Sequence, residues 1–367
     1  MPVRTPRAGT AFGIHTAPVP SIPYLHQIVL PTPWDVGSVQ VYLVDRDPLT
    51  LIDTGVRTPE SLSLVQAALA SLGHELGSVR RVLLTHYHGD HLGQVASVRR
   101  ASAELEVCAH LDEVDMIEGF SPQRNEQITE HMELFRDHGV DEQTNVARAE
   151  WLRERVGNEP VLCEATAVDR QLRGGDRVEF DGFALVVHHV PGHTAGHVVY
   201  EHAETGTLLT GDHVMGNAVP STTSYYTGNE PASQDPLGRR PRFRGLPAYL
   251  QSLRALKQLS VESILPAHGG VISRGDRAID EALLFYDVRI QRIERGLRTL
   301  AAMGQDVTAW DLFKALFPKA DPVTGMRNRF LMVIGALDVL EDRRLCVAHR
   351  RSDGVLLHRH APAGGSD

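Results

Sequence analysis

The chain has 367 residues, a length that predicts one large α/β domain with insertions or a core domain with a small appendage. Its 37 Lys and Arg residues against 46 Asp and Glu residues give a formal net charge of -9, which does not favour overall attraction of a polyanion but leaves room for a local basic patch. Cys108, Cys163 and Cys346 lie far apart and form no C-x-x-C pair, so the sequence indicates neither a disulfide framework nor a thiolate metal site.

The apolar runs of the chain are too short for membrane insertion. No stretch approaches the roughly 18 consecutive apolar residues that a membrane-spanning helix needs, and the N-terminal residues contain no apolar run of signal-peptide length. We therefore expect a cytoplasmic protein without a membrane partner. Residues 1–36 are rich in Pro and Gly without helical periodicity, so we expect an N-terminal arm there.

Residues 37–275 alternate between strand and helix patterns, which predicts the α/β core domain of the chain. Apolar residues at helical spacing predict helices at 59–72 and 246–259. Residues 111–158 contain few β-branched residues and are expected to form a helical insertion. Short β-branched and leucine-rich runs bounded by polar turns predict strands at 39–44, 49–53, 79–84, 105–109, 183–190, 198–202, 207–212 and in the segment SILPAHG.

The C-terminal part of the chain changes character after residue 275. Three helical patterns are followed by two short β-like runs joined by Ser-Asp-Gly, an order that is typical of a winged-helix-like domain. We expect this domain over residues 276–360 and a disordered tail over residues 361–367. The helices are expected at 279–303, 309–316 and 326–340, and the β-like runs at 345–349 and 355–358.

A long polar stretch lies between the last two strands of the predicted α/β core domain. Residues 220–245 contain Pro and Gly and show no strong period. Long ordered loops in compact domains tend to be functional, so this stretch is a candidate substrate loop. Tyr225 and Tyr226 are its candidate hydrogen-bond donors to a developing oxyanion, with ordinary packing of the loop as the alternative.

The segment Thr-His-Tyr-His-Gly-Asp-His follows directly after a predicted strand. It offers three imidazoles and one carboxylate, those of His86, His88, Asp90 and His91. Divalent metals such as zinc bind imidazole nitrogen and carboxylate oxygen at about 2 Å, and a loop at a strand end can turn all four side chains inward. A histidine-rich surface loop is the alternative, but alternate histidines flanked by glycine favour a metal site.

Three further strands are each followed by a polar residue of the same kind. The segments VVHHVPGHTAGH, TLLTGDH and SILPAHG place His193, Asp212 and His268 just beyond a strand's carboxyl end. Such ends converge on one edge of a sheet with parallel segments. Four separate segments therefore point to one metal site.

The unbroken His-x-His-x-Asp-His pattern at residues 86–91 resembles the hallmark of the metallo-β-lactamase superfamily. The resemblance covers roughly residues 37–275 and implies an αββα sandwich. Asp53 of LIDTG matches the family's aspartate on an early strand, and His193, Asp212 and His268 match its later ligands.

The resemblance implies two metal ions. His86, His88 and His193 would hold one ion, Asp90, His91 and His268 the other, and Asp212 would bridge them. Asp53 is implied to hold the ligand loop, as ligating side chains need orienting partners. His197 occupies a position that is often histidine in glyoxalase-II-like relatives and is expected to support a ligand. Zinc is the expected metal, with iron or manganese as alternatives.

This arrangement predicts a hydrolase that uses a metal-activated water. Asp90 is the candidate catalytic residue, because a carboxylate with one oxygen on a metal can orient the nucleophile and accept its proton with the other. The family's fold serves thioesters, lactones, β-lactams and phosphate esters alike, so the site fixes the reaction type better than the substrate.

Three functions stay open on the sequence alone. The first is a hydrolase of a small-molecule thioester, ester or lactone, similar to glyoxalase II. The second is an endoribonuclease or phosphodiesterase of the lactamase-beta-like type, with nucleic acid as partner; the apolar helix FLMVIGALDVL indicates burial and weighs against it. The third is a metal-binding scaffold without catalysis. The sequence leaves the oligomeric state open, with the helical insertion and the C-terminal domain as candidate surfaces for a homodimer. Five arginines near the predicted C-terminal hairpin are consistent with nucleic-acid binding: Arg343, Arg344, Arg350, Arg351 and Arg359.

Overall fold

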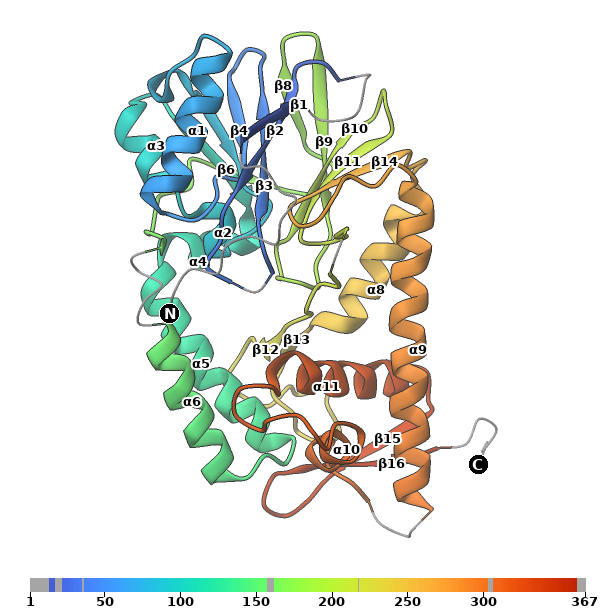
Figure 1. Cartoon of the computed structure of the whole chain (residues 1–367). Coiled ribbons are helices and arrows are strands. Elements are labelled where there is room, and N and C mark those ends of the chain that lie inside the picture. The colour runs from blue at the N-terminus through green and yellow to red at the C-terminus, as the bar shows by residue number, and fades with distance from the viewer. Residues whose placement is uncertain are drawn as a thin grey trace. The chain divides into compact units, whose positions relative to one another are not determined.

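The computed structural model describes residues 13–16, 22–34, 36–156, 162–216, 218–302 and 306–361 (Figure 1). Half of the expected N-terminal arm, namely residues 1–12, 17–21 and 35, and all of the expected tail except residue 361 lie outside these residues. In the part of the chain that is described, no helix is long and apolar enough to span a bilayer.

The chain folds into two compact units, and both are discontinuous in sequence. The first unit contains residues 1–123, 158–220 and 252–280, and the second contains residues 124–157, 221–251 and 281–367. The sequence pattern predicts continuous domains instead. The difference arises because the helical segment expected to cap the catalytic domain, and the expected substrate loop, both fold largely with the C-terminal residues.

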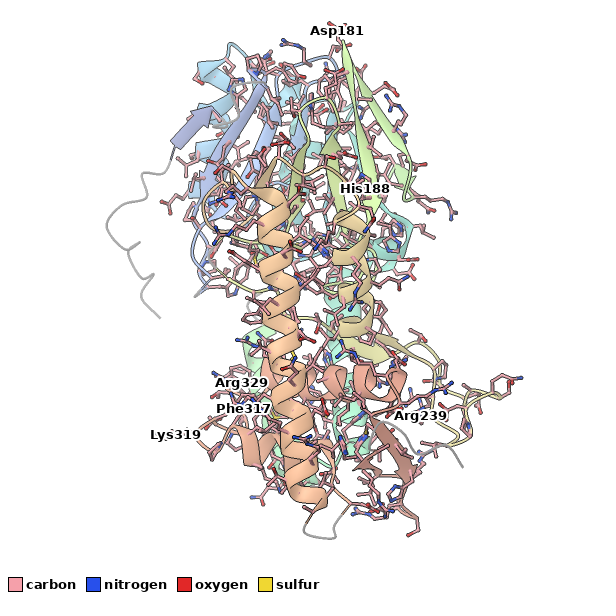
Figure 2. The ribbon with its side chains drawn as sticks, turned by 90° about the vertical axis from the view of Figure 1, so that its right-hand side faces the viewer. Asp181, His188, Arg239, Phe317, Lys319 and Arg329 are labelled. Carbon is pink, nitrogen blue, oxygen red and sulfur yellow. The ribbon has the colours of Figure 1, made fainter. Side chains whose placement is uncertain are left out.

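The first unit contains two sheets. The larger has seven strands in sequential order, antiparallel from β1 to β4 and parallel from β4 to β7. The smaller has the order β14-β11-β10-β9-β8, with β14 parallel to β11. Asp181 lies at the tip of the β8–β9 hairpin (Figure 2). The strands are β1 Gly13–Thr16, β2 Leu25–Leu30, β3 Val39–Val44, β4 Thr50–Ile52, β5 Arg81–Leu83, β6 Glu106–His110, β7 Arg170–Leu172, β8 Arg177–Phe180, β9 Phe183–His189, β10 Val198–His202, β11 Thr207–Gly211 and β14 Ser263–Pro266.

Alternating side chains of the larger sheet explain its two buried faces. On β3, Val41 and Leu43 pack in the cluster that contains residues of α1 and α3, whereas Tyr42 and Val44 pack in the cluster shared with the smaller sheet. Helices α1 and α3 cover the outer face of the larger sheet (Figure 1). The helices wholly within this unit include α1 Pro59–Ser71, η1 Leu76–Ser78, α2 Gly89–Leu92, α3 Val95–Ala101, η2 Leu111–Glu113 and α4 Val114–Glu118.

The second unit is mainly helical and has an aromatic core. Phe330 contacts Phe135, Trp310 and Phe313 at ring-centroid distances of 4.9, 5.5 and 5.8 Å. Three helices belong partly to this unit: α5 Phe120–Asp137, α8 Gly245–Leu256 and α9 Gly275–Ala301. Three others belong to it entirely: α6 Glu142–Val156, α10 Ala309–Leu316 and α11 Arg327–Asp342. The hairpin β15 Cys346–Arg350 and β16 Leu356–His360 follows the helices, in the order that the sequence predicts.

One prediction about this unit is wrong. The stretch expected to be a loop contains a short antiparallel ladder, β12 Ser224–Tyr226 paired with β13 Arg242–Arg244. Each strand has three residues, too few to show an alternating pattern.

Candidate metal centre

The carboxylate of Asp53 fixes the loop that carries the His-x-His-x-Asp-His motif. Strands β4 and β5 are parallel neighbours, so Asp53 and Thr85 follow strand ends at the same edge of the sheet. Asp53 accepts hydrogen bonds from the Thr85 backbone N–H, the Thr85 hydroxyl and His91 Nδ1, at 2.8, 2.8 and 2.7 Å. These bonds orient His91 so that its Nε2 atom faces Asp90 and Asp212.

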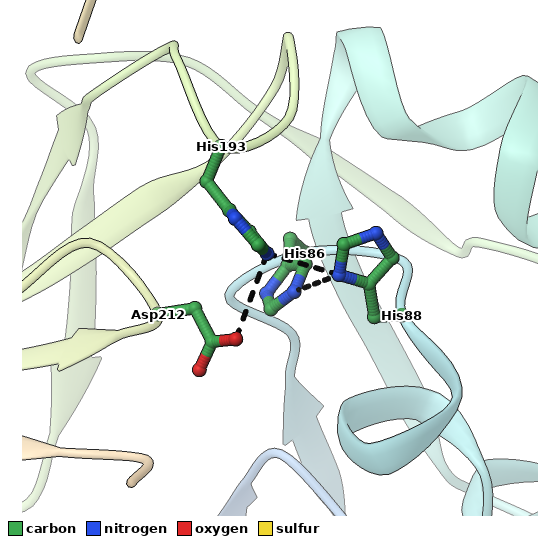
Figure 3. A group of neighbouring side chains, drawn as sticks. All are labelled: His86, His88, His193 and Asp212. Carbon is green, nitrogen blue, oxygen red and sulfur yellow. Dashed lines mark hydrogen bonds and ion pairs between the residues drawn. The ribbon is translucent and has the colours of Figure 1, made fainter. Parts of the chain in front are cut away.

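A first group of possible ligands consists of His86, His88, His193 and Asp212. The Nδ1 atom of His88 lies 2.9 Å from His86 Nε2 and 3.0 Å from His193 Nε2. The Oδ2 atom of Asp212 lies 3.5 Å from His193 Nε2. Figure 3 shows these side chains pointing toward one another from three different segments.

A second group consists of Asp90, His91 and His268. His268 donates from Nδ1 to the Ser38 carbonyl at 2.8 Å, which turns its Nε2 atom to 3.3 Å from Asp90 Oδ2 and 3.4 Å from Asp212 Oδ1. His91 Nε2 lies 3.5 Å from the same Asp212 Oδ1 atom. The two oxygens of Asp212 therefore approach different groups.

The separations around Asp212 and His268 fit metal ions better than hydrogen bonds, whereas His88 lies at hydrogen-bond distance from His86 and His193. Two ligands of a tetrahedral zinc at about 2.1 Å lie about 3.4 Å apart, close to the 3.3–3.5 Å separations around Asp212 and His268. His91 Nε2, Asp212 Oδ1 and His268 Nε2 are buried and have no hydrogen-bond partner. Buried polar atoms are normally satisfied, so these atoms call for a cation.

The charges around the groups support the same reading. Burial, followed by the neighbouring His91 and His88, holds the pKa of His86 well below its ordinary value, so this imidazole is neutral and able to bind metal. Burial alone would lower the pKa of His91, but Asp53, Asp90 and Asp212 raise it to about 10. The carboxylates thus favour positive charge at this position.

His197 and the glycine before Asp212 support the ligands from behind. His197 is buried, stacks on His86 with ring centroids 4.8 Å apart, and accepts from the Asp212 backbone N–H at 3.2 Å. Gly211 has φ 50, and a Cβ atom there would lie 2.7 Å from the Thr85 hydroxyl. Glycine therefore allows the end of β11 to approach the motif loop.

Glu113 is a site residue that the sequence analysis misses. It is buried, and its two oxygens accept from the backbone N–H groups of Tyr87 at 2.8 Å and Gly196 at 2.7 Å. Tyr87 lies between two predicted ligands, and Gly196 lies between His193 and His197. Glu113 thus joins two ligand loops; no metal motif contains it, so no local signal points to it.

Tyr225 and Tyr226, the candidate substrate residues, belong to a different unit from the ligand groups. Both belong to β12 in the second unit. The Tyr226 ring is buried and its hydroxyl donates to Asp137. The structure therefore gives no support for their role as oxyanion donors.

A third His/Asp group lies outside the two described above. His110, Asp112 and His189 have possible ligand atoms within 4.8 Å of one another. The two imidazole rings stack at 3.9 Å with an angle of 16° between their planes. Stacked rings direct their nitrogen lone pairs in parallel planes, and His189 Nε2 already bonds the Ala195 carbonyl at 2.8 Å. This geometry is poor for a shared ion.

Comparison with known proteins agrees with the site. The model of the Metallo-beta-lactamase superfamily matches residues 34–268. The chain belongs to the metallo-β-lactamase superfamily. It is 30% identical over 319 residues to "Probable metallo-hydrolase YqjP" of Bacillus subtilis, covering 86% of this chain and 91% of that protein.

Two further matches come from a solved structure and a fungal enzyme. A metallo-beta-lactamase family protein of Thermus thermophilus superposes with a TM-score of 0.68 at 24% identity, covering 93% of this chain and all of that one, which confirms the predicted αββα superfamily fold. The chain is also 24% identical to "Atrochrysone carboxyl ACP thioesterase" of Aspergillus fumigatus, over 69% of this chain but only 42% of that protein.

Substitution of Glu113 tests its part in the superfamily site. In Glu113→Gln one acceptor oxygen becomes an amide donor that faces a backbone N–H, so the two ligand loops lose their common anchor. We expect metal affinity to fall by roughly 10- to 100-fold, as measured by titration with a chelator. Glu104→Gln is the matched control, because Glu104 is 79% exposed. Equal metal affinity in both variants would contradict this role.

The raised pKa of His91 predicts a pH dependence of metal binding. The metal-free protein holds a proton on His91 below pH values of about 10. A cation must displace that proton, so affinity for the second ion should rise with pH, by up to about tenfold per unit for one proton. Calorimetric titration in buffers of different ionisation enthalpy measures the protons released. Binding without proton release at pH 7 would be inconsistent with the assignment of His91.

Proposed function

We propose that the protein is a binuclear metal-dependent hydrolase that acts on small-molecule thioesters, esters or lactones. Superfamily membership and the metallo-hydrolase and thioesterase relatives confirm the broader class, a metal-dependent hydrolase. The observation that carries the finer proposal is the convergence of two ligand groups on the opposite oxygens of Asp212.

The proposed ligand sets follow from that convergence. His86, His88 and His193 would hold one ion, Asp90, His91 and His268 would hold the other, and Asp212 would be a ligand shared by both. When bound, two divalent ions lower the pKa of water toward 7 and polarise a substrate's carbonyl oxygen. Asp53 and Ser38 orient His91 and His268 through their Nδ1 atoms, and His197 supports Asp212.

Asp90 is the proposed proton acceptor. Burial would raise its pKa, but His91 and His268 lower it to about 2, so the carboxylate is ionised at neutral pH. One Asp90 oxygen lies 3.3 Å from His268 Nε2, and the other lies 3.7 Å from His91 Nε2. An ionised carboxylate in this position can orient the attacking water and receive its proton.

Zinc is the proposed metal, with iron or manganese as alternatives. The donors are imidazole and carboxylate groups, which suit all three metals. The cysteines Cys108, Cys163 and Cys346 are buried and belong to neither ligand group. Elemental analysis of the purified protein identifies the metal.

Acyl substrates are favoured over RNA by the second unit. Helix α11, which would be the DNA- or RNA-contacting helix of a winged-helix domain, is buried from Phe330 to Leu340 except for the half-buried Met332. Arg351 pairs with Asp353 and Arg359 with Asp306, so these cations are partly neutralised. The thioesterase named above supports acyl chemistry for the superfamily site. A cytoplasmic location and the candidate homodimer surfaces stay predictions from the sequence.

A substrate panel tests the proposal directly. The metal-loaded protein should hydrolyse a generic thioester or lactone, and a chelator should abolish that turnover. Hydrolysis of bis-phosphate esters or RNA alone, with salt-sensitive RNA degradation, would instead support the nuclease. Absence of chelator-sensitive turnover on every substrate would support a non-catalytic scaffold.

Substitution of Asp90 tests its chemical role. Asp90→Asn keeps the size of the side chain but removes the proton acceptor, so kcat should fall by about 10²- to 10⁴-fold. The thermal unfolding midpoint should stay near wild type, and turnover is compared at equal metal content, measured by elemental analysis, because Asp90 is also a proposed ligand. Asp181→Asn, at the tip of the β8–β9 hairpin, is the control. Near wild-type turnover of Asp90→Asn with full metal content would exclude this role.

A further inference from the structure

Among the described residues, Arg148 stands out as a buried charge without a hydrogen-bond partner. It lies on α6 in the second unit and is fully buried, and none of its three guanidinium nitrogens has a hydrogen-bond partner. Among the described residues, no other arginine or lysine leaves a buried side-chain nitrogen unsatisfied. At the candidate metal centre, similar orphaned atoms fit the ions that the superfamily site would hold. By the same argument, the unsatisfied guanidinium of Arg148 indicates a missing ligand, which here would be an anion.

The surroundings of Arg148 do not neutralise it. The guanidinium carbon lies 4.5 Å from the centroid of the Phe135 ring, and that ring packs on Phe330. A cation–π contact covers one face of the guanidinium, but its five N–H donors lie in the plane and need acceptors. Burial, and then the like charge of Arg327, lower the pKa of Arg148 to about 9, so it remains charged at pH 7.

A second orphaned atom lies one helical turn away. Asn145 and Arg148 are three residues apart on α6, so their side chains lie on neighbouring positions of one face. Asn145 is buried; its Nδ2 atom donates to the Met132 carbonyl at 2.7 Å, while its Oδ1 atom has no donor. The pair thus offers donors for an oxyanion and an acceptor for a hydroxyl group or a water molecule.

We propose that Arg148 and Asn145 form a binding site in the second unit for a small molecule that bears a carboxylate. The planar guanidinium fork matches a carboxylate in a bidentate pair. A carboxylate carries one charge, which Arg148 can balance. A phosphate dianion would leave a second charge to be desolvated beside Phe135 and Phe330, at a higher cost. The site shares no residue with the proposed hydrolase centre.

Thermal unfolding of the metal-loaded full chain tests the site. The protein is incubated overnight with sodium acetate, benzoate or phosphate at constant ionic strength, with chloride as reference. Acetate or benzoate should raise the Tm of the wild type in a saturating manner, by about 5 °C at a hundred times Kd. Arg148→Met should abolish this increase in Tm. Because the variant keeps every predicted metal ligand, an increase caused by carboxylates binding to the metal would persist in it. Arg329→Met, at an exposed arginine labelled in Figure 2, should respond like the wild type.

Two further measurements make the result decisive. Arg148→Lys keeps the charge but loses the fork, so it should bind at least about tenfold more weakly, and it replaces Arg148→Met if that variant does not fold. Small molecules are also extracted from denatured wild-type protein and identified by mass spectrometry. One equivalent of a carboxylate that is retained through purification by the wild type, and is absent from the variant, would equally support the site. No retained carboxylate together with equal Tm responses in wild type and variant would overturn the proposal, as would Arg148-dependent binding of phosphate alone.

Discussion

The three hydrogen bonds to the Asp53 carboxylate hold together the part of the molecule on which the site depends. They join the end of β4 to the start of the motif loop after β5, and they set the direction of His91. Asp53 itself has a positive φ of 58, a backbone conformation that aspartate tolerates better than most residues. The parallel pairing of β4 with β5 makes this contact possible, because it brings both carboxyl ends to one edge.

Charge balance explains why the remaining residues gather there. Asp53, Asp90 and Asp212 are all buried, and burial of carboxylates is costly unless positive charge lies beside them. Neutral imidazoles cannot supply that charge, so a proton on His91 or bound cations must do so. The same arrangement that favours cations also places an ionised Asp90 beside them, which links the stability of the site to its proposed chemistry.

The second unit presents the opposite electrostatic situation. Its core is aromatic around Phe330, and Arg148 is enclosed beside it with the Phe135 ring face against its guanidinium and no hydrogen-bond partner among the described residues. Elsewhere in the unit, buried charge is paired: Arg242 forms two hydrogen bonds to the Asp338 carboxylate. Arg148 differs from Arg242 in lacking such a carboxylate, and this difference indicates a site for an external anion.

Local sequence patterns were sufficient to predict most strands and helices of the fold and the candidate metal ligands. The β-branched runs place most strands within one to three residues of their observed bounds, α10 is observed at its predicted residues, and the His-x-His-x-Asp-His motif lies in one loop. His193, Asp212 and His268 could be predicted because each directly follows a strand, and strand ends converge. The tertiary structure alone decided the role of Glu113, whose partners lie 26 and 83 residues away. It also decided the pairing of β12 with β13 and the grouping of α6 with the C-terminal helices. The physical reason is that periodicity reports which side of an element is buried, whereas the partner across a long sequence separation is set only when the elements pack.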